Sequence, residues 1–214
     1  MEFSGQKNQI VEDKTYLLLK RIMDIVLSLL GIIILSPVMV LIALCIKLED
    51  PRGPIIFTQK RCGQYSNQFN IYKFRSMFVD AEERLKDLQH LNEQTGPVFK
   101  IKNDPRITKV GKFIRKTSLD ELPQLFNVIR GDMSIVGPRP ALPLEVEQYT
   151  PYQMQRLLVK PGITCIWQVS GRNNIGFNEW IEMDIKYIQE RTLFLDIKLI
   201  LLTIPALLGD ENAS

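Results

Sequence analysis

The sequence predicts an α+β protein that is mostly helical and that meets a membrane through one apolar segment near its N-terminus. The first observation is an uncharged run of 22 residues, 25–46. The second is that apolar residues recur three and four positions apart over 122–129 and 177–188, which is helical spacing. The third is a pair of short strand-like stretches, 55–59 and 69–76.

Composition limits the classes of function. At 214 residues the chain suits one domain with a sizeable core, and 45% apolar with 24% charged residues is ordinary for a folded protein. A net charge of +3 does not favour a nucleic-acid partner, and no helix-turn-helix or zinc-finger pattern occurs. Three widely spaced cysteines and a single histidine, His90, argue against a disulfide framework, a zinc site and histidine-based catalytic triads.

The apolar segment is long enough to cross a bilayer, which takes about 20 helical residues. Ser36-Pro37 lies at its middle, and proline removes a backbone donor and clashes with the preceding turn, so a bend is expected there. Both flanks carry lysine and arginine, whereas normally only the cytoplasmic flank of a spanning helix is basic. A kinked spanning helix and a re-entrant helix that returns to the same face both stay open on these grounds.

Further elements follow from local patterns. The stretch 69–76 would place Lys73 and Arg75 on one face, because side chains alternate along a strand. Residues 161–164 and 169–173 have the composition of turns. The uncharged run 199–208 is too short to span a membrane, so we expect it along the interface or as a core helix.

Two adjacent carboxylates, Asp120 and Glu121, lie between a basic pair and the start of the helix predicted from Leu122. Nearby cations and a helix N-terminus both favour the ionised form of a carboxylate. An ionised carboxylate can attack phosphorus or hold a divalent metal. The alternative is that Ser118 and Glu121 form a capping box, S-x-x-E, which only starts a helix.

Arg139 lies between Pro138 and Pro140, which restrict the backbone around it. A rigidly held guanidinium is suited to bidentate contact with phosphate. The alternative is a proline-rich turn whose arginine is simply solvated.

Taken together, the chain resembles the bacterial sugar transferases, small monotopic phosphoglycosyl transferases that act on polyprenyl phosphate. The matching stretches occur in order from about residue 20 to 208: Lys20-Arg21-Ile22-Met23-Asp24, Ser36-Pro37, Gln59-Lys60-Arg61-Cys62-Gly63, Tyr72-Lys73-Phe74-Arg75-Ser76-Met77, Asp104-Pro105-Arg106-Ile107-Thr108, Ser118-Leu119-Asp120-Glu121-Leu122-Pro123-Gln124, Val136-Gly137-Pro138-Arg139-Pro140, Pro161-Gly162-Ile163-Thr164, Gln168-Val169-Ser170-Gly171-Arg172 and Leu195-Asp196-Ile197-Lys198.

The resemblance implies a mechanism. Asp120 would attack the β-phosphorus of a UDP-sugar and expel UMP, and polyprenyl (undecaprenyl) phosphate would then attack the sugar-phosphoryl-aspartate. Glu121 would coordinate Mg²⁺ as the cofactor. The cations implied for phosphate binding are Arg115, Arg139 and Arg172, with Lys73 and Arg75 as companions. The resemblance also implies a re-entrant membrane helix with its kink at Ser36 and Pro37.

The resemblance further implies a place and an organisation. We expect the cytoplasmic face of a bacterial inner membrane, contact with membrane phospholipid, and a role in surface polysaccharide or glycoconjugate synthesis. A homo-oligomer, or association with downstream glycosyltransferases, is compatible with this. The expected divisions are a polar tail (1–19), the re-entrant membrane helix (20–48), a cytoplasmic catalytic domain (49–208) and a C-terminal tail (209–214).

Two departures and two rival functions belong beside this prediction. Cys165 stands where the family usually has glycine, and the chain lacks the several spanning helices of larger relatives, as a minimal member or an isolated catalytic domain would. One rival is a non-catalytic, membrane-anchored module that binds lipids or a partner, for which basic flanks would suffice. The other is a glycosyl transferase that moves the sugar without its phosphate and releases UDP.

Overall fold

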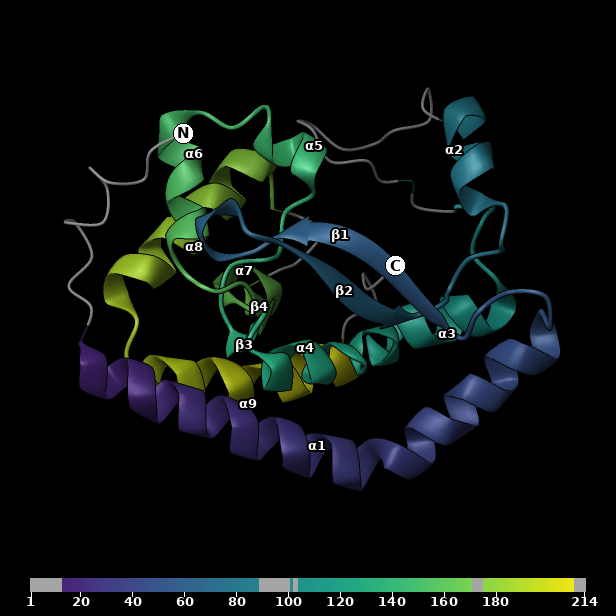
Figure 1. Cartoon of the computed structure of the whole chain (residues 1–214), viewed down its shortest axis with the longest axis horizontal. Coiled ribbons are helices and arrows are strands. Elements are labelled where there is room, and N and C mark those ends of the chain that lie inside the picture. The colour runs from purple at the N-terminus through teal and green to yellow at the C-terminus, as the bar shows by residue number, and fades with distance from the viewer. Residues whose placement is uncertain (1–12, 89–100, 102–103, 171–174, 210–214) are drawn as a thin grey trace.

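The computed structural model describes residues 13–88, 101, 104–170 and 175–209. Within these ranges the fold is mostly helical with two small two-stranded sheets, which confirms the predicted mixture (Figure 1). The elements in chain order are α1 (Lys14–Glu49), β1 (Ile56–Cys62), η2 (Gln64–Ser66), β2 (Gln68–Phe74), α2 (Ala81–Leu88), α3 (Lys109–Lys116), η4 (Leu119–Glu121), α4 (Gln124–Arg130), β3 (Ser134–Val136), α5 (Pro143–Val146), α6 (Pro151–Met154), η5 (Gln155–Leu158), β4 (Gly162–Thr164), α7 (Ile166–Val169), α8 (Phe177–Glu190) and α9 (Leu193–Gly209).

Helix α1 contains the whole apolar run and is bent near its middle, so that it lies as a wide V beneath the other elements in Figure 1. It begins at Lys14, inside the expected tail, because the Asp13 side chain accepts a hydrogen bond from the backbone N–H of Thr15 at 2.9 Å. Pro37 lies within the helix, and Ser36 Oγ donates to the Ile33 carbonyl at 2.8 Å. The bend thus accompanies a proline that leaves a carbonyl without its usual helical donor.

The first half of α1 is fixed to the rest of the fold by polar contacts. Lys20 Nζ forms an ion pair with Asp196 Oδ2 of α9 at 2.9 Å, where both side chains are almost fully buried. Arg21 donates to the carbonyls of Val128 and Ile129 at 2.6 and 2.7 Å, at the C-terminal end of α4. Cations at this end of a helix satisfy free carbonyls and oppose its dipole.

The second half of α1 is fixed by apolar contacts. Ile42 and Ile46 are buried and pack in one cluster with Phe74, at the end of β2, and Ile114 of α3. Both halves of α1 therefore contact the same body, on either side of the bend.

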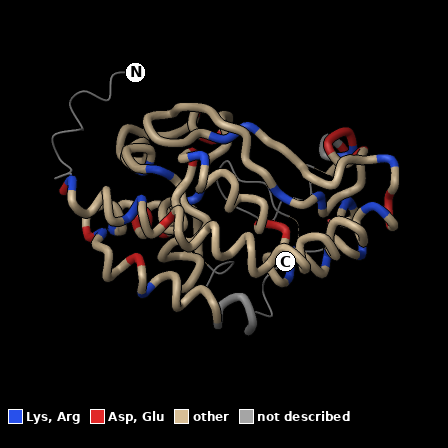
Figure 2. The backbone as a smooth tube through the Cα atoms, turned by 60° about the horizontal axis from the view of Figure 1, so that its bottom comes forward, with Lys and Arg blue, Asp and Glu red and all other residues tan. Residues whose placement is uncertain are grey.

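The outward side of α1 is apolar. Its exposed positions include Leu18, Ile33, Ile34, Val40, Leu41 and Leu48, which are 60–83% exposed. In Figure 2 the 25–46 stretch is free of blue and red, and charged residues lie at its two ends. Within the described ranges α1 is the one helix long and apolar enough to cross a membrane, and 11% of its most apolar 18 residues are buried.

The C-terminal apolar run forms part of α9, which lies beside α1 in Figure 1. Leu199 is 3% exposed and contributes to the core, whereas Leu201 and Ile204 are 61% and 55% exposed. The expected core location thus holds for one side of this helix, and its other side is apolar and exposed.

Strands β1 and β2 form an antiparallel hairpin, with Ile56 opposite Phe74 and Cys62 opposite Gln68. Both strands fall where the sequence predicts them, although β1 extends to Cys62 and β2 ends at Phe74, one residue before Arg75. The hairpin contacts α4 and η4 through β2 and α5 through β1.

Strands β3 and β4 form a parallel pair in which Ser134 is opposite Gly162 and Val136 opposite Thr164. The prediction of a turn over 161–164 was wrong, because these residues pair with a strand that lies nearly 30 positions earlier. A β-carbon on Gly162 would come within 2.1 Å of the Gly137 nitrogen, so only glycine lets the two backbones approach. This pairing fixes the loop that follows β3.

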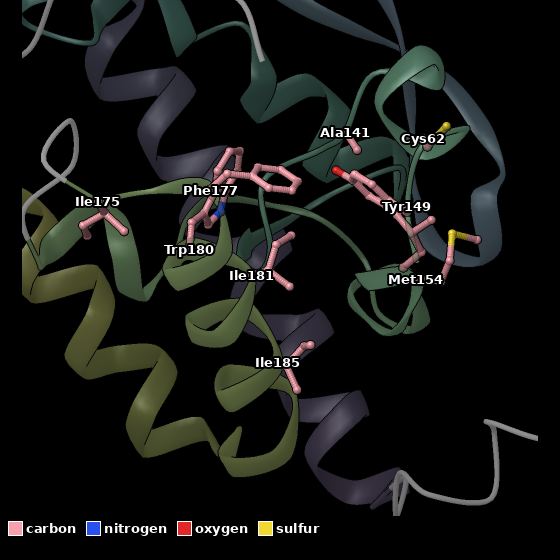
Figure 3. Packing of buried hydrophobic residues seen from close by; sticks show 10 residues of the cluster. Cys62, Ala141, Tyr149, Met154, Ile175, Phe177, Trp180, Ile181 and Ile185 are labelled. Carbon is pink, nitrogen blue, oxygen red and sulfur yellow. The ribbon is translucent and has the colours of Figure 1, made fainter. Parts of the chain in front are cut away.

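The C-terminal core forms around α8, whose predicted apolar residues are all buried: Phe177, Trp180, Ile181, Ile185 and Ile188. Figure 3 shows Phe177 and Trp180 next to each other, with Tyr149 across from them. The rings of Phe177 and Trp180 meet edge-to-face at 5.9 Å and 87°. Helical periodicity therefore identified this part of the core correctly.

Candidate active site

The acidic pair occupies η4, a short turn between α3 and α4. Ser118 begins this turn with φ 54°, a left-handed conformation that redirects the chain after α3. The Ser118 side chain makes no capping hydrogen bond, so the capping-box alternative is not the role of this motif. Helix α4 then begins at Gln124, two residues later than the spacing suggested, with Pro123 before it.

Lys73 of β2 reaches the acidic pair from the hairpin. Its Nζ lies 2.6 Å from Glu121 Oε1 and 4.0 Å from Asp120 Oδ2. Lys73 was predicted to accompany the phosphate-binding cations, and the structure brings it directly to the two carboxylates. The close contact fixes Glu121, whereas the Asp120 carboxylate is left at a longer distance.

Burial is the largest influence on the pKa of Asp120. It raises the pKa of Asp120 to about 6, although the positive charges of Lys73 and Arg115 oppose the rise and the charge of Glu121 adds to it. Burial alone would also raise the pKa of Glu121, but Lys73 and then Arg139 outweigh it and lower the pKa. The expectation that surrounding cations favour ionisation therefore holds for Glu121 and not for Asp120.

Arg115 and Arg139 approach the pair from two other elements. Arg115, in the last turn of α3, opposes the rise in the pKa of Asp120. Arg139 follows β3, and its charge lowers the pKa of Glu121. The structure thus gathers Lys73, Arg115 and Arg139 around two carboxylates, as a site for a phosphorylated substrate requires.

The guanidinium of Arg139 is held in place by neighbouring side chains, but not all of its N–H donors have hydrogen-bond partners. Its Nη1 lies 3.6 Å from Glu145 Oε1, and its Cζ lies 5.2 Å from the centre of the Trp180 ring. Within the described part of the chain, this Nη1 is buried without a hydrogen-bond partner. A buried donor without a partner has capacity for an anion, so the solvated-turn alternative does not describe Arg139.

Arg61 of β1 is a site residue that sequence reasoning missed. Its Nη1 donates to the Pro140 carbonyl at 3.1 Å, and its Nε is buried without a partner among the described residues. Burial, followed by the positive charge of Arg139, lowers the pKa of Arg61 to about 10. Arg61 belongs to one of the matching stretches, but only the fold separates it from exposed Lys60 beside it.

A buried network supports the backbone of Arg139. Arg156 donates to Asp184 Oδ2 at 2.6 Å, to the Tyr149 hydroxyl at 2.6 Å and to the Arg139 carbonyl at 3.2 Å. Arg156 and Asp184 are each 1% exposed. Tyr149, which Figure 3 draws within the core, therefore connects this network to the buried apolar cluster.

The structure does not bring every predicted residue to the acidic pair. Arg75 instead donates to Asp50, at 3.2 Å to Oδ2 and 2.6 Å to the carbonyl, near the C-terminal end of α1. It lies beyond the end of β2, where strand alternation no longer applies. Arg172 and His90 fall outside the described residues.

Cys165 is compatible with its backbone position. Its φ of −157° is extended and open to any residue, so the position does not require the glycine that the family usually has. The thiol is 1% exposed, and burial raises its pKa well above the ordinary range.

The side chains of the site fit a magnesium ion whose remaining ligands come from the phosphates of a substrate. Among the described residues no group of three or more His, Cys, Asp or Glu side chains could hold a metal ion. Asp120 and Glu121 supply two carboxylates. Mg²⁺ is commonly held by one or two carboxylates together with substrate phosphates rather than by an all-protein cage.

Comparison with known proteins identifies the family. The bacterial sugar transferase model matches residues 15–210. The chain belongs to the bacterial sugar transferase family. This match includes α1, the acidic pair and the whole core around α8.

Three relatives illustrate what the chain is similar to. A galactosyl transferase, CpsE, of Streptococcus agalactiae is 50% identical over 93% of this chain and 44% of its own length. An undecaprenyl-phosphate galactose phosphotransferase of Salmonella typhimurium is 46% identical over 91% of this chain and 41% of its own length. The exopolysaccharide production protein ExoY of Rhizobium meliloti is 38% identical over 87% of this chain and 84% of its own length. The chain thus spans less than half the length of the first two.

Proposed function

We propose that this bacterial sugar transferase moves a sugar 1-phosphate from a UDP-sugar to undecaprenyl phosphate and releases UMP. The observation that carries the proposal is the Asp120 carboxylate, buried and loosely paired, beside Glu121 and surrounded by cations from three elements. The name of the Salmonella relative, which includes both a sugar phosphotransferase and the lipid phosphate, supports the same reaction class.

The chemistry proceeds in two displacements. An Asp120 oxygen bonds to the β-phosphorus of the UDP-sugar, and the bond from that phosphorus to the bridging oxygen breaks, so that UMP leaves with the oxygen and the electron pair. An oxygen of undecaprenyl phosphate then bonds to the same phosphorus, and the bond to Asp120 breaks. The products are undecaprenyl-diphospho-sugar and a regenerated carboxylate.

The other residues bind and orient. Lys73 lies within 4.0 Å of both carboxylates, where it offsets the charge that gathers when a diphosphate approaches. Arg61 and Arg139 offer buried N–H groups without hydrogen-bond partners among the described residues, which suits phosphate oxygens. Glu121, with Asp120 beside it, would hold Mg²⁺, which supplies charge neutralisation for the diphosphate when bound.

We further propose that α1 is re-entrant and that the site faces the cytoplasm of a bacterial cell. Lys20 lies before the apolar run and Ile46 is its last residue, and each contacts the same body of the protein. A helix that crossed the bilayer would place these two positions on opposite sides of the membrane. The bend at Pro37 and the basic flanks support a helix that returns to its own side.

The reaction is tested by incubating the purified chain with Mg²⁺, undecaprenyl phosphate and a panel of UDP-sugars, and identifying the nucleotide product. UMP together with a sugar phosphate adduct on the peptide that contains Asp120 supports the proposal. UDP would indicate a glycosyl transferase, and no nucleotide product from any UDP-sugar would favour the lipid- or partner-binding module.

Topology is tested separately. Single cysteines placed near the N-terminus and after Leu48, in a background without Cys45, Cys62 and Cys165, should both react only from the cytoplasmic side. Labelling from opposite sides would mean that α1 spans the membrane.

A further inference from the structure

A cavity with several charged lining residues lies at the other end of α4 from the acidic pair. It has a volume of about 370 Å³ and lies between the N-terminal turns of α1, the tip of the β1–β2 hairpin and the β3–β4 region. Its charged lining residues are Lys20, Arg21, Asp24, Lys160 and Arg191. None of these residues has a role in the proposed transfer reaction.

The charges around this cavity are unbalanced. Lys20 is neutralised by its ion pair with Asp196. In contrast, none of Arg21, Lys160 and Arg191 forms an ion pair with a carboxylate within the described ranges. The one acidic side chain of the lining accepts a hydrogen bond from the backbone N–H of Ile135 at 3.0 Å. The cavity therefore carries an excess of positive charge.

Two of the cations converge on one turn. A β-carbon placed on Gly131 would lie 3.5 Å from Arg21 Nη2 and 3.6 Å from Lys160 Nζ. Burial and then the charge of Arg21 lower the pKa of Lys160, although Asp24 and Asp132 oppose this. An anion between the two cations would relieve their repulsion.

The cavity also adjoins the apolar outer side of the molecule. Leu17 is part of its lining, and Leu18, on the next position of α1, is 62% exposed. Phe194, at the start of α9 and three residues after Arg191, is 79% exposed. A ligand with a charged group and an apolar chain could therefore occupy the cavity and the outer surface together.

We propose that this cavity is a second anion site that binds a phosphate group through Lys160, Arg21 and Arg191. The group could come from a membrane phospholipid, whose acyl chains would lie beside Leu18 and Phe194, or from free phosphate. It is distinct from the catalytic site, because its cations approach the C-terminal end of α4 whereas the acidic pair precedes its N-terminal end.

The experiment measures acetylation of individual lysines in the full chain, held in phosphatidylcholine nanodiscs, by peptide mass spectrometry. One arm replaces part of the lipid with phosphatidylglycerol, and the other adds inorganic phosphate at constant ionic strength. Bound phosphate should shield Lys160 and raise its pKa, and a rise of one unit lowers its free-amine fraction about tenfold. Lys14, exposed in the first turn of α1 and outside the cavity, is the internal control.

Selective protection of Lys160 by phosphatidylglycerol alone supports the site with a lipid source, and selective protection by inorganic phosphate supports it with a free source. Protection by neither, or equal protection of Lys14, overturns the proposal.

A matched pair of variants gives a second readout that does not depend on acetylation. Lys160→Gln should reduce retention of phosphatidylglycerol in native mass spectrometry about tenfold, whereas Lys14→Gln should leave it unchanged. Equal retention by both variants, once each is confirmed as folded by circular dichroism, overturns the lipid source of the phosphate group. Neither measurement depends on transferase activity, so failure of the proposed reaction would leave this test intact.

Discussion

Two buried aspartates of this chain have opposite surroundings. Asp184 of α8 is 1% exposed, and its carboxylate lies 2.6 Å from the guanidinium of Arg156. Asp120 of η4 is 8% exposed, and within the described part of the chain its only salt-bridge contact is Lys73 at 4.0 Å. Asp184 is thus held by a short charged contact, whereas Asp120 is buried without one.

The difference separates a structural carboxylate from a reactive one. A short contact with arginine occupies Oδ2 of Asp184 and, through the same guanidinium nitrogen, connects α8 to the loop that carries Arg139. Burial raises the pKa of both aspartates to about 6, but Asp120, without such a contact, keeps its oxygens available to attack a substrate. Burial alone therefore does not distinguish the two roles, and the distance to the nearest cation does.

The largest expected effect is on the reaction. Asp120→Asn should lower UMP release by at least about 10³-fold, because an amide cannot act as the nucleophile. The measurement is single-turnover UMP release with saturating UDP-sugar. Asp184→Asn is the matched control, since it makes the same substitution at the other aspartate and should keep measurable activity at a temperature where it is folded. Undiminished release by Asp120→Asn would contradict the assignment of the nucleophile.

The same pair of variants should differ in stability in the opposite sense. Asp184→Asn leaves the Arg156 charge buried without its counterion and should lower the free energy of unfolding by about 3–5 kcal/mol. Asp120→Asn should leave it unchanged or raise it by about 1–3 kcal/mol at pH 7.5. The reason is that Asp120 has no short contact with a cation and its folded pKa of about 6 exceeds the ordinary value of 3.8, so its ionisation costs stability that is lost from about pH 3.8 upward and fully lost above pH 6. The pKa of Asp184 is raised to the same value, but its removal also strands the buried charge of Arg156. Denaturant titration measures the free energy of unfolding of both variants. Equal losses of stability would contradict the distinction between the two aspartates.

The pH dependence of the reaction should follow the ionisation of Asp120. Ionised Asp120 is the nucleophile, so the rate of UMP release should fall about tenfold per unit as pH decreases below about 6 and should be level above pH 7. The measurement is a pH profile from 5 to 8 under single-turnover conditions, with the folded state verified at each pH. A rate that stays constant down to pH 5 would mean that this carboxylate has an ordinary pKa.

The smallest expected effect is a shift of the pH profile when Lys73, the cation nearest to Asp120, is replaced. Lys73→Gln removes the strongest influence that lowers the pKa of Asp120, so the acidic limb of the profile should shift upward by about one unit. Lys60→Gln is the control, because Lys60 is exposed on the neighbouring strand. A shift in the downward direction would show that Lys73 does not act on Asp120 through its charge.

Much of the fold was predictable because its signals are local. The apolar segment, its proline, the hairpin strands and α8 all follow from periodicity and residue type within about 20 positions. The β3–β4 pair was not predictable in this way, because it depends on two glycines 25 positions apart that allow the backbones to touch. The resemblance to sugar transferases, confirmed by the family match, came from many short motifs in one order.

The candidate site was predictable only in part. Asp120, Glu121 and Arg139 stood out by residue type and neighbours, and the fold places all three together. Arg61 did not stand out, because its position beside Arg139 depends on how β1 packs against the loop at Pro140. Arg75 was misplaced for the same reason, since its partner Asp50 is 25 positions away.

By itself, the sequence determined the kinds of element and the chemical groups available, because helical and strand periodicity and side-chain chemistry are properties of short segments. The tertiary structure decided which of those groups are charged, paired or free. Burial and distance set the pKa of Asp120, the contact that occupies Asp184 and the open donors of Arg61 and Arg139, and both quantities depend on packing between segments far apart in the chain.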